Sequence, residues 1–296
     1  MRTIALRVKR DSMELLYSKN DNQEPFRKFI ITYDTGQTIG DNLEKIKVAL
    51  AGLKIDAAIL LNSLEYEFSD TIIGINHNRI DIGLAITNML NIPVVSQSDV
   101  EKNGLNKAVK RKENYNEWHL DYFGEYEKKR NYGQEAMLTI GNGYFGLRGA
   151  YVESRADSDN YPGTYVAGVY NQLTTKIGDR DVTNEDLVNM PNAQFITFGV
   201  DGQPPFTINK KDIQDIYRSL DLKHGVLRTA MHVQLSTGHD LSIVTTKVAN
   251  MKNWHDYAIH YAITPLNFSG TLQIYSEIDG TVTNGNVERY QDFDQH

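Results

Sequence analysis

The spacing of apolar residues changes near Trp118, and this change constrains the fold more than any other feature of the chain. Before Trp118, short apolar runs alternate with segments in which apolar residues recur every three or four positions. After it, apolar and polar residues alternate, and turn pairs such as Asp201-Gly202 and Asp279-Gly280 separate the runs. The first pattern is typical of strands mixed with amphipathic helices, and the second of half-buried strands. The sequence therefore predicts an α+β multidomain protein, with an α/β part followed by an all-β part.

The first part has the element order β-β-β-α-β-α-β-α. Asp41 with Glu44, and Ser98 with Glu101, have the spacing of helix-capping boxes. The order predicts a small α/β module over residues 1–106, with the pattern of a ribonuclease-H-like or actin-like lobe. Strands are expected at residues 3–8, 13–17, 29–33, 55–61 and 92–95, and helices from Asp41, over residues 79–90 and from Ser98. A separate nucleotide-related activity of this module is an alternative, against which the lack of a phosphate-binding loop counts.

A basic segment divides the two parts. Residues 107–116 contain Lys107, Lys110, Arg111 and Lys112 and few apolar residues, which indicates a solvated helix end and a linker. The second part, residues 117–296, is expected to form an antiparallel β-sandwich, because it has many short strands and almost no helical periodicity. Its strands are predicted at residues 194–200, 226–235, 241–248, 258–263 and 271–278.

A glycine-rich stretch, Gly141-x-Gly143-x-x-Gly146, follows an apolar run and has the spacing of a dinucleotide-binding fingerprint. A phosphate site would need a helix to begin here, but Arg148-Gly149 would interrupt that helix within one turn. Tyr144 and Phe145 would also crowd a pyrophosphate that requires close approach to the backbone. The stretch is therefore predicted to be a β-turn between strands, in which glycine supplies positive φ.

Four segments in series carry a family resemblance. They are residues 138–149 (Leu-Thr-Ile-Gly-Asn-Gly-Tyr-Phe-Gly-Leu-Arg-Gly), residues 162–170 (Pro-Gly-Thr-Tyr-Val-Ala-Gly-Val-Tyr), residues 185–191 (Glu-Asp-Leu-Val-Asn-Met-Pro) and residues 217–227. In order and spacing, from about residue 117 to the end, they resemble the N-terminal domain of glycoside hydrolase family 65. That family contains maltose, trehalose and kojibiose phosphorylases and related hydrolases.

The resemblance implies a large β-sandwich, or super-sandwich, in front of a catalytic (α/α)6 barrel. It also implies an α-glucosidic disaccharide and inorganic phosphate as substrates, and a homodimer. The catalytic Glu and the phosphate-binding residues of the family would lie in the barrel. No succession of long helices follows the predicted sandwich, so we expect the barrel to be absent and the sandwich to be incomplete at its C-terminal end. The chain would then be a non-catalytic scaffold, inactive alone, to which no catalytic residue is assigned.

The remaining residue types give little support to chemistry in this chain. The adjacent carboxylates Glu185 and Asp186 are expected in a turn, where neighbouring side chains rarely converge. The sequence has no Cys and its eight His are dispersed, so neither a metal site nor a cofactor is predicted, and a reducing cytoplasm is indicated. Residues 113–296 hold 15 Lys and Arg against 24 Asp and Glu, which disfavours nucleic acid as a partner. No apolar run approaches the length of a membrane span.

Aromatic side chains are the remaining candidates for sugar contact, because sugars stack their apolar faces on rings. Most are expected in the core, since aromatic residues dominate sandwich interiors. The hypothesis of a sugar contact is kept for Tyr144 and Tyr165, which lie in glycine-rich loops. An alternative function for the whole chain is a stand-alone carbohydrate-binding or scaffold protein. The candidates considered are Trp118, Tyr144, Phe145, Tyr165, Tyr170 and Trp254.

Overall fold

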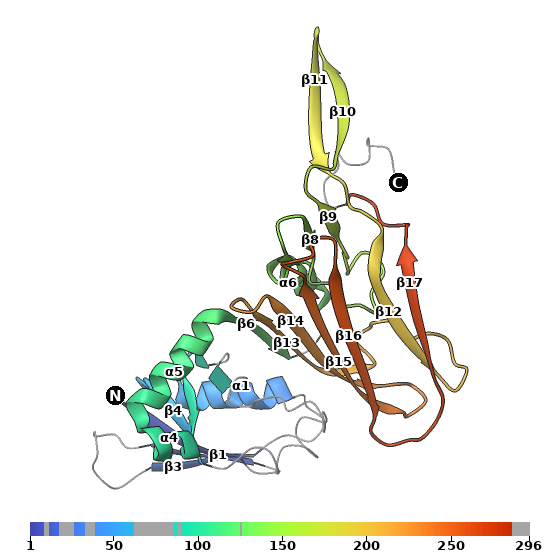
Figure 1. The fold of residues 1–296 in the computed structure, drawn as a ribbon. Helices are drawn as coiled ribbons and strands as arrows, with labels where there is room; N and C mark the ends of the chain where they lie inside the picture. Colours follow the sequence, from blue (N-terminus) through green and yellow to red (C-terminus); the bar gives the residue numbers. More distant parts are fainter. Residues whose placement is uncertain are drawn as a thin grey trace.

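The computed structural model of the chain describes residues 1–8, 12–17, 27–32, 39–61, 86–87, 90–124 and 126–285. Its sheets are mostly antiparallel, and strands outnumber helices (Figure 1). This mainly β architecture agrees with the prediction of an antiparallel sandwich for the second part. None of the helices in the described ranges is both long and apolar enough to cross a membrane.

A five-stranded mixed sheet forms the N-terminal part. Strand β1 pairs antiparallel with β2 and parallel with β4; β3 extends the sheet beside β2, and β5 beside β4. Leu6 and Leu15 of the sheet pack with Ile46 of helix α1 (Ile39–Leu50) in one core. Every strand expected in this part is present, with bounds shifted by at most two residues. The strands are β1 (Thr3–Val8), β2 (Ser12–Tyr17), β3 (Arg27–Thr32), β4 (Ala57–Leu60) and β5 (Val94–Ser96), in the order β3-β2-β1-β4-β5.

Both predicted helix starts lie two residues too late in the sequence. Helix α1 begins at Ile39, so Asp41 lies within it. Helix α4 (Gln97–Asn103) is capped by Ser96, whose hydroxyl accepts a hydrogen bond from the Asp99 amide at 3.2 Å, and not by Ser98. The extended backbone of Ser96 allows this bond, whereas Ser98 is already helical. The helix predicted over residues 79–90 lies largely outside the described residues.

Helix α5 (Leu105–Trp118) runs through the basic segment, and strand β6 (His119–Gly124) follows it directly. Strand β6 is the edge of a second sheet, which is antiparallel throughout and has the order β16-β15-β14-β13-β6. The other strands of this sheet are β13 (Ile213–Asp221), β14 (Val226–Gln234), β15 (Asp240–Ala249) and β16 (Tyr257–Pro265).

A two-stranded antiparallel sheet of β12 (Asn192–Val200) and β17 (Leu272–Asp279) packs against the five-stranded sheet of the second part. Phe198 of β12 meets Met231 and Ile243 of the large sheet, and all three are fully buried. The strands predicted for the second part are therefore confirmed, while β6 and β13 were not predicted.

One tyrosine joins the two parts. Tyr217 of β13 is buried and packs in the N-terminal core with side chains of the mixed sheet and helix α1. Its hydroxyl donates a hydrogen bond to Asp121 Oδ1 of β6 at 3.1 Å. A side chain of the second part thus completes the core of the first.

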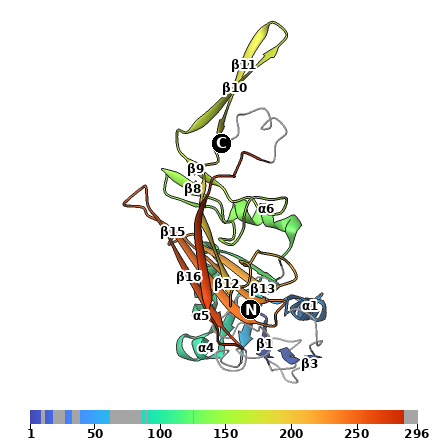
Figure 2. The same ribbon diagram turned by 90° about the vertical axis from the view of Figure 1, so that its right-hand side faces the viewer.

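The opposite end of the sandwich carries helix α6 (Lys128–Met137) and a small sheet of β7 (Ile140–Gly141), β8 (Phe145–Leu147) and β9 (Thr164–Val166). Beyond them a hairpin of β10 (Tyr170–Ile177) and β11 (Arg180–Leu187) projects from the body in both views (Figures 1 and 2). The turn expected at Glu185 and Asp186 is wrong, because both residues pair within β11. The chain turns instead after Ile177, where Gly178 has a φ of +62°.

Candidate functional site

The glycine-rich stretch forms the turn between β7 and β8, as predicted. Asn142 holds this turn: its Oδ1 accepts from the amides of Tyr144 and Phe145 at 3.1 Å each. Gly143 has a φ of +87°, a conformation that disfavours other residues. Because the last glycine of the stretch, Gly146, lies within strand β8 and not at the start of a helix, the turn lacks the helix start that would bind a dinucleotide phosphate.

Tyr144 lies on the surface beside this turn. Its ring packs edge-on against His255 with 4.4 Å between ring centroids, and it is 37% exposed. Trp254, next in the chain to His255, is 61% exposed, and its carbonyl accepts from Asn142 Nδ2 at 3.0 Å. Asn142 thereby joins Tyr144, Trp254 and His255 into one exposed group, here called the aromatic cluster.

Tyr165 lies in a different set of contacts. Its hydroxyl donates to the hydroxyl of Tyr161 at 3.3 Å, and the Tyr161 hydroxyl accepts from the Gly285 amide at 3.0 Å. Through Tyr161, Tyr165 is therefore linked to residues near the end of the described chain, whereas Tyr144 belongs to the aromatic cluster.

Asn189 is the centre of a junction between three segments far apart in the sequence. Its Oδ1 accepts from the Thr164 amide at 3.0 Å, and its Nδ2 donates to the carbonyls of Pro162 and Thr283 at 3.2 and 3.3 Å. Its own amide donates to Asn284 Oδ1 at 2.7 Å. Two of the segments that carry the family resemblance, residues 162–170 and 185–191, are thus held together here.

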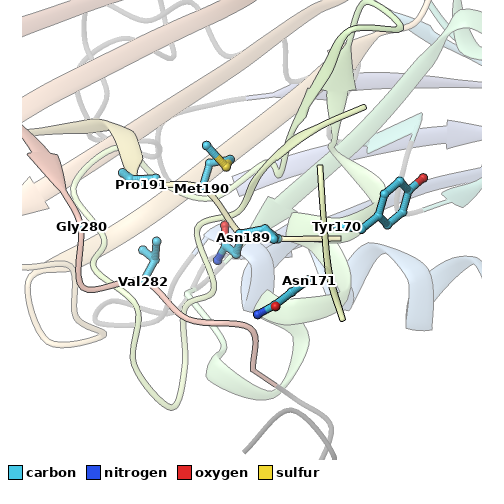
Figure 3. Close-up of a pocket in the computed structure, with 8 residues that line it drawn as sticks. Tyr170, Asn171, Asn189, Met190, Pro191, Gly280 and Val282 are labelled. Carbon is cyan, nitrogen blue, oxygen red and sulfur yellow. The ribbon is translucent and has the colours of Figure 1, made fainter. Parts of the chain in front are cut away.

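A cavity of about 290 Å³ opens at this junction, at the base of the hairpin (Figure 3). The side chain of Asn189, the buried polar group of the lining, already makes hydrogen bonds with both of its polar atoms. The lining therefore presents mainly apolar surface to an occupant. It consists of Tyr170, Asn171, Val188, Asn189, Met190, Pro191, Gly280 and Val282.

Charged side chains are buried beneath the junction. Glu135 of α6 is fully buried; it accepts from the Tyr161 amide at 2.9 Å and from Asn131 Nδ2 at 2.9 Å, and it faces Arg148 at 3.6 Å. Burial raises the pKa of Glu135, and these hydrogen bonds and the nearby arginines oppose that rise. Arg218 of β13, also fully buried, donates to the carbonyl of Gly149, and its guanidinium lies 4.2 Å from the centre of the Tyr151 ring.

A second pair of charged side chains, those of Glu153 and Lys247, is buried in the sandwich. Lys247 of β15 donates to the Ala150 carbonyl at 2.6 Å and to Gln194 Oε1 at 2.9 Å. Burial, followed by the charge of Arg218, lowers the pKa of Lys247 to about 7. Burial also raises the pKa of Glu153 to about 7. These charged side chains interact with strands and loops inside the sandwich, and they line no surface cavity that the structure describes.

Sequence reasoning missed this buried network. One signal was available: Arg218 interrupts an alternating strand pattern, and Lys247 does the same in β15, at positions where the strand residues beside them are buried. Among the described residues, no three His, Asp or Glu side chains are grouped so as to hold a metal ion.

The aromatic candidates are more exposed than predicted. Of the six, only Phe145 is buried, with 8% of its surface exposed; Trp118 and Tyr170, like Tyr144 and Trp254, lie on the surface. The expectation that most would pack in the core is wrong, because other residues, among them Phe198, Phe206 and Met231, fill the space between the sheets.

Comparison with known proteins identifies the second part. Residues 123–296 match the family model for glycosyl hydrolase family 65, N-terminal domain. Trehalose 6-phosphate phosphorylase of Lactococcus lactis subsp. lactis (strain IL1403) is 39% identical over 178 residues, which are 60% of this chain and 22% of that protein.

Two further likenesses agree with this match. Kojibiose phosphorylase of Caldanaerobacter subterraneus subsp. tengcongensis is 31% identical over 160 residues, 54% of this chain and 20% of that one. A solved structure from the human microbiome, provisionally assigned as a kojibiose phosphorylase, superposes with a TM-score of 0.50 at 16% identity, over 56% of this chain and 22% of that one. At that identity the superposition shows the fold alone. The chain spans about a fifth of the length of these relatives.

Proposed function

The chain belongs to glycosyl hydrolase family 65 through its N-terminal domain, and we propose that it is the non-catalytic scaffold of such an enzyme. In this role the sandwich packs against a catalytic (α/α)6 barrel, shapes the rim of its active site and supports dimerisation. The substrates of the complete enzyme would be an α-glucosidic disaccharide and inorganic phosphate, as the names of the relatives suggest.

One observation carries this proposal: the charged and amide side chains of the matched region are used to hold the region itself together. The side chains of Asn142, Asn189 and Arg218 all donate hydrogen bonds to backbone carbonyls of neighbouring loops. In residues 138–285 the structure has strands and loops and no helix, so nothing described there resembles part of a helical barrel. Both facts favour a structural role over a role in bond cleavage.

We further propose a division into a module of residues 1–106, a connection over residues 107–116 and the sandwich of residues 117–296. The strand order β3-β2-β1-β4-β5, with two antiparallel and two parallel pairs of neighbours, supports a ribonuclease-H-like module. The packing of Tyr217 into its core supports a fixed attachment of the module to the sandwich.

A chimera tests the scaffold function. The matched region of the Lactococcus lactis phosphorylase is replaced by residues 123–296, and phosphate-dependent cleavage of trehalose 6-phosphate is measured. We expect the chimera to retain activity, deletion of the region to abolish it, and the 296-residue chain alone to show no turnover. Turnover by the isolated chain, or a folded chimera without activity, would refute the proposal.

A second candidate function is carbohydrate binding by the isolated chain, and the aromatic cluster is the observation that favours it. Exposed Trp254 and Tyr144 offer ring surfaces on which a sugar could stack. Calorimetry with maltose, trehalose and kojibiose tests this function. If it holds, Tyr144→Ala weakens binding at least tenfold and Tyr165→Phe leaves it unchanged. No measurable heat with any sugar would exclude it.

A further inference from the structure

Thioether sulfurs are the groups of this chain that peroxides oxidise most readily, because the chain contains no cysteine. The rate of this oxidation depends on whether the peroxide can reach the sulfur, so exposure separates the seven methionines. Met251 is 71% exposed and Met137 60%, whereas Met13 and Met231 are fully buried in the cores of the first and second parts. Met251 is the most exposed methionine among the described residues.

Met251 lies in the loop between β15 and β16, and hydrogen bonds hold this loop in place. Within the loop, Asn250 Oδ1 accepts from the amides of Lys252 and Asn253 at 2.9 and 3.0 Å. From outside it, Asn142 Nδ2 donates to the carbonyl of Asn250 at 2.8 Å. The Met251 side chain is therefore exposed in the folded loop, and peroxide can reach it without unfolding.

The same loop carries two members of the aromatic cluster. Trp254, which is 61% exposed, and His255 follow Met251 in the loop, and Asn142 also donates to the Trp254 carbonyl at 3.0 Å. One asparagine thus fixes the backbone on both sides of Met251. A change in the polarity of the Met251 side chain consequently changes the loop on which the aromatic cluster is built.

We propose that Met251 is a site of reversible oxidation, which makes the loop of the aromatic cluster more polar. A lone pair of the thioether sulfur attacks one oxygen of hydrogen peroxide, and the O–O bond breaks. The departing hydroxide takes the proton of the transferred oxygen and leaves as water. The sulfur is thereby oxidised to a sulfoxide, and the peroxide is reduced.

The reverse reaction requires a reductant. Methionine sulfoxide reductases supply it from two thiols, which are oxidised to a disulfide while the sulfoxide oxygen leaves as water. Each of the two sulfoxide epimers has its own reductase, and an exposed loop leaves the sulfur accessible to both enzymes.

The position of Met251 allows this change without loss of the fold. A sulfoxide is polar, and at an exposed position water hydrates it. In the sandwich core, where Met231 packs with Phe198 and Ile243, the same oxygen would be buried without a hydrogen-bond partner. Oxidation at Met251 therefore alters the surface, whereas oxidation at Met231 would destabilise the sandwich.

Peptide mapping by mass spectrometry during a time course in hydrogen peroxide tests the site. In the folded 296-residue chain, we expect Met251 and Met137 to be oxidised at least about tenfold faster than Met13 and Met231. The buried pair is the internal control. In concentrated urea the four rates should become equal, because unfolding exposes every sulfur. A folded chain in which Met251 reacts as slowly as Met231 would refute the proposal.

Hydrophobic-interaction chromatography tests the change in polarity. The Met137→Leu variant removes the other strongly exposed sulfur of the folded body, and after oxidation it should elute earlier with its melting temperature unchanged. The matched control, Met137→Leu with Met251→Leu, should show a smaller shift in elution. Equal shifts in the two variants, or a melting temperature that falls only when Met251 is present, would contradict the proposal.

Reversibility has its own readout. Treatment of the oxidised Met137→Leu variant with both methionine sulfoxide reductases and dithiothreitol should return the Met251 peptide to its original mass and restore the elution. A sulfoxide that persists at Met251 would overturn this part of the proposal. These measurements require neither a catalytic barrel nor a sugar, so their outcome is separate from that of the chimera and of the sugar titrations.

Discussion

Replacing Glu153 by Gln should make the sandwich less sensitive to a rise in pH. Glu153 is 2% exposed, and its Oε1 accepts no hydrogen bond from the described residues. The titratable groups around it are Lys247 of β15, Arg218 of β13 and Tyr261 of β16. Burial raises the pKa of the Glu153 carboxyl from about 4.5 to about 7, and the interactions with its neighbours only partly offset that rise.

The sign and size of the effect follow from this pKa. Between pH 4.5 and 7 the folded state keeps the Glu153 proton that the unfolded state releases, so stability falls as the pH rises through this window. A difference of about 2.5 pKa units corresponds to a loss of about 3 kcal/mol, most of which has occurred by pH 7.5. Gln has nearly the same shape and never ionises, so the Glu153→Gln variant lacks this loss.

Urea unfolding of the wild type and of Glu153→Gln at pH 5.0 and at pH 8.0 measures the effect. Relative to the wild type, we expect the free energy of unfolding of the variant to increase by about 2–3 kcal/mol from pH 5.0 to pH 8.0. Glu185→Gln, a substitution of an exposed residue in strand β11, is the control and should show no such change. A difference that is the same at both pH values would refute the reasoning, because it would mean that the buried carboxyl does not change its protonation on unfolding.

Three further predictions concern the same scaffold. In the wild type, the lowered pKa of Lys247 makes stability rise between pH 7 and about 10.5, since the unfolded state alone binds that proton; Lys247→Met should flatten this rise in thermal unfolding. Gly149→Ala should lower the free energy of unfolding by about 1–3 kcal/mol and lower the melting temperature, because the new Cβ would lie 2.5 Å from Leu138 Cβ. In the control Gly146→Ala the new Cβ meets nothing within 4 Å, so the melting temperature should change little. Tyr217→Ala should lower the free energy of unfolding in urea by about 3–5 kcal/mol, because it leaves a cavity in the N-terminal core. Tyr217→Phe loses only the hydrogen bond to Asp121 and should lower it by at most about 1.5 kcal/mol. Equal losses for the two variants would show that the ring does not pack there.

The sequence alone identified the strands of the N-terminal sheet and five strands of the mainly β part, but it missed β6, β13 and the hairpin strands β10 and β11. Local information is sufficient for this, because the period of apolar residues and the turn pairs lie within a few residues of each other. The glycine-rich turn was predictable for the same reason: the residues that exclude a helix, Arg148 and Gly149, directly follow it. The order and spacing of the four motif segments were also enough to indicate the family.

Only the tertiary structure brought distant segments together. Asn189 joins residues 162–164 to residues 283–284 through hydrogen bonds, and no local pattern marks it as a centre. The burial of Glu153 and Lys247 likewise depends on two sheets and a loop meeting, and it is this burial that shifts their pKa values. Whether an aromatic ring or a side chain of the β10–β11 hairpin is exposed depends on what lies opposite it in space. Sequence periodicity records which residues share a face, but it does not record whether another element covers that face.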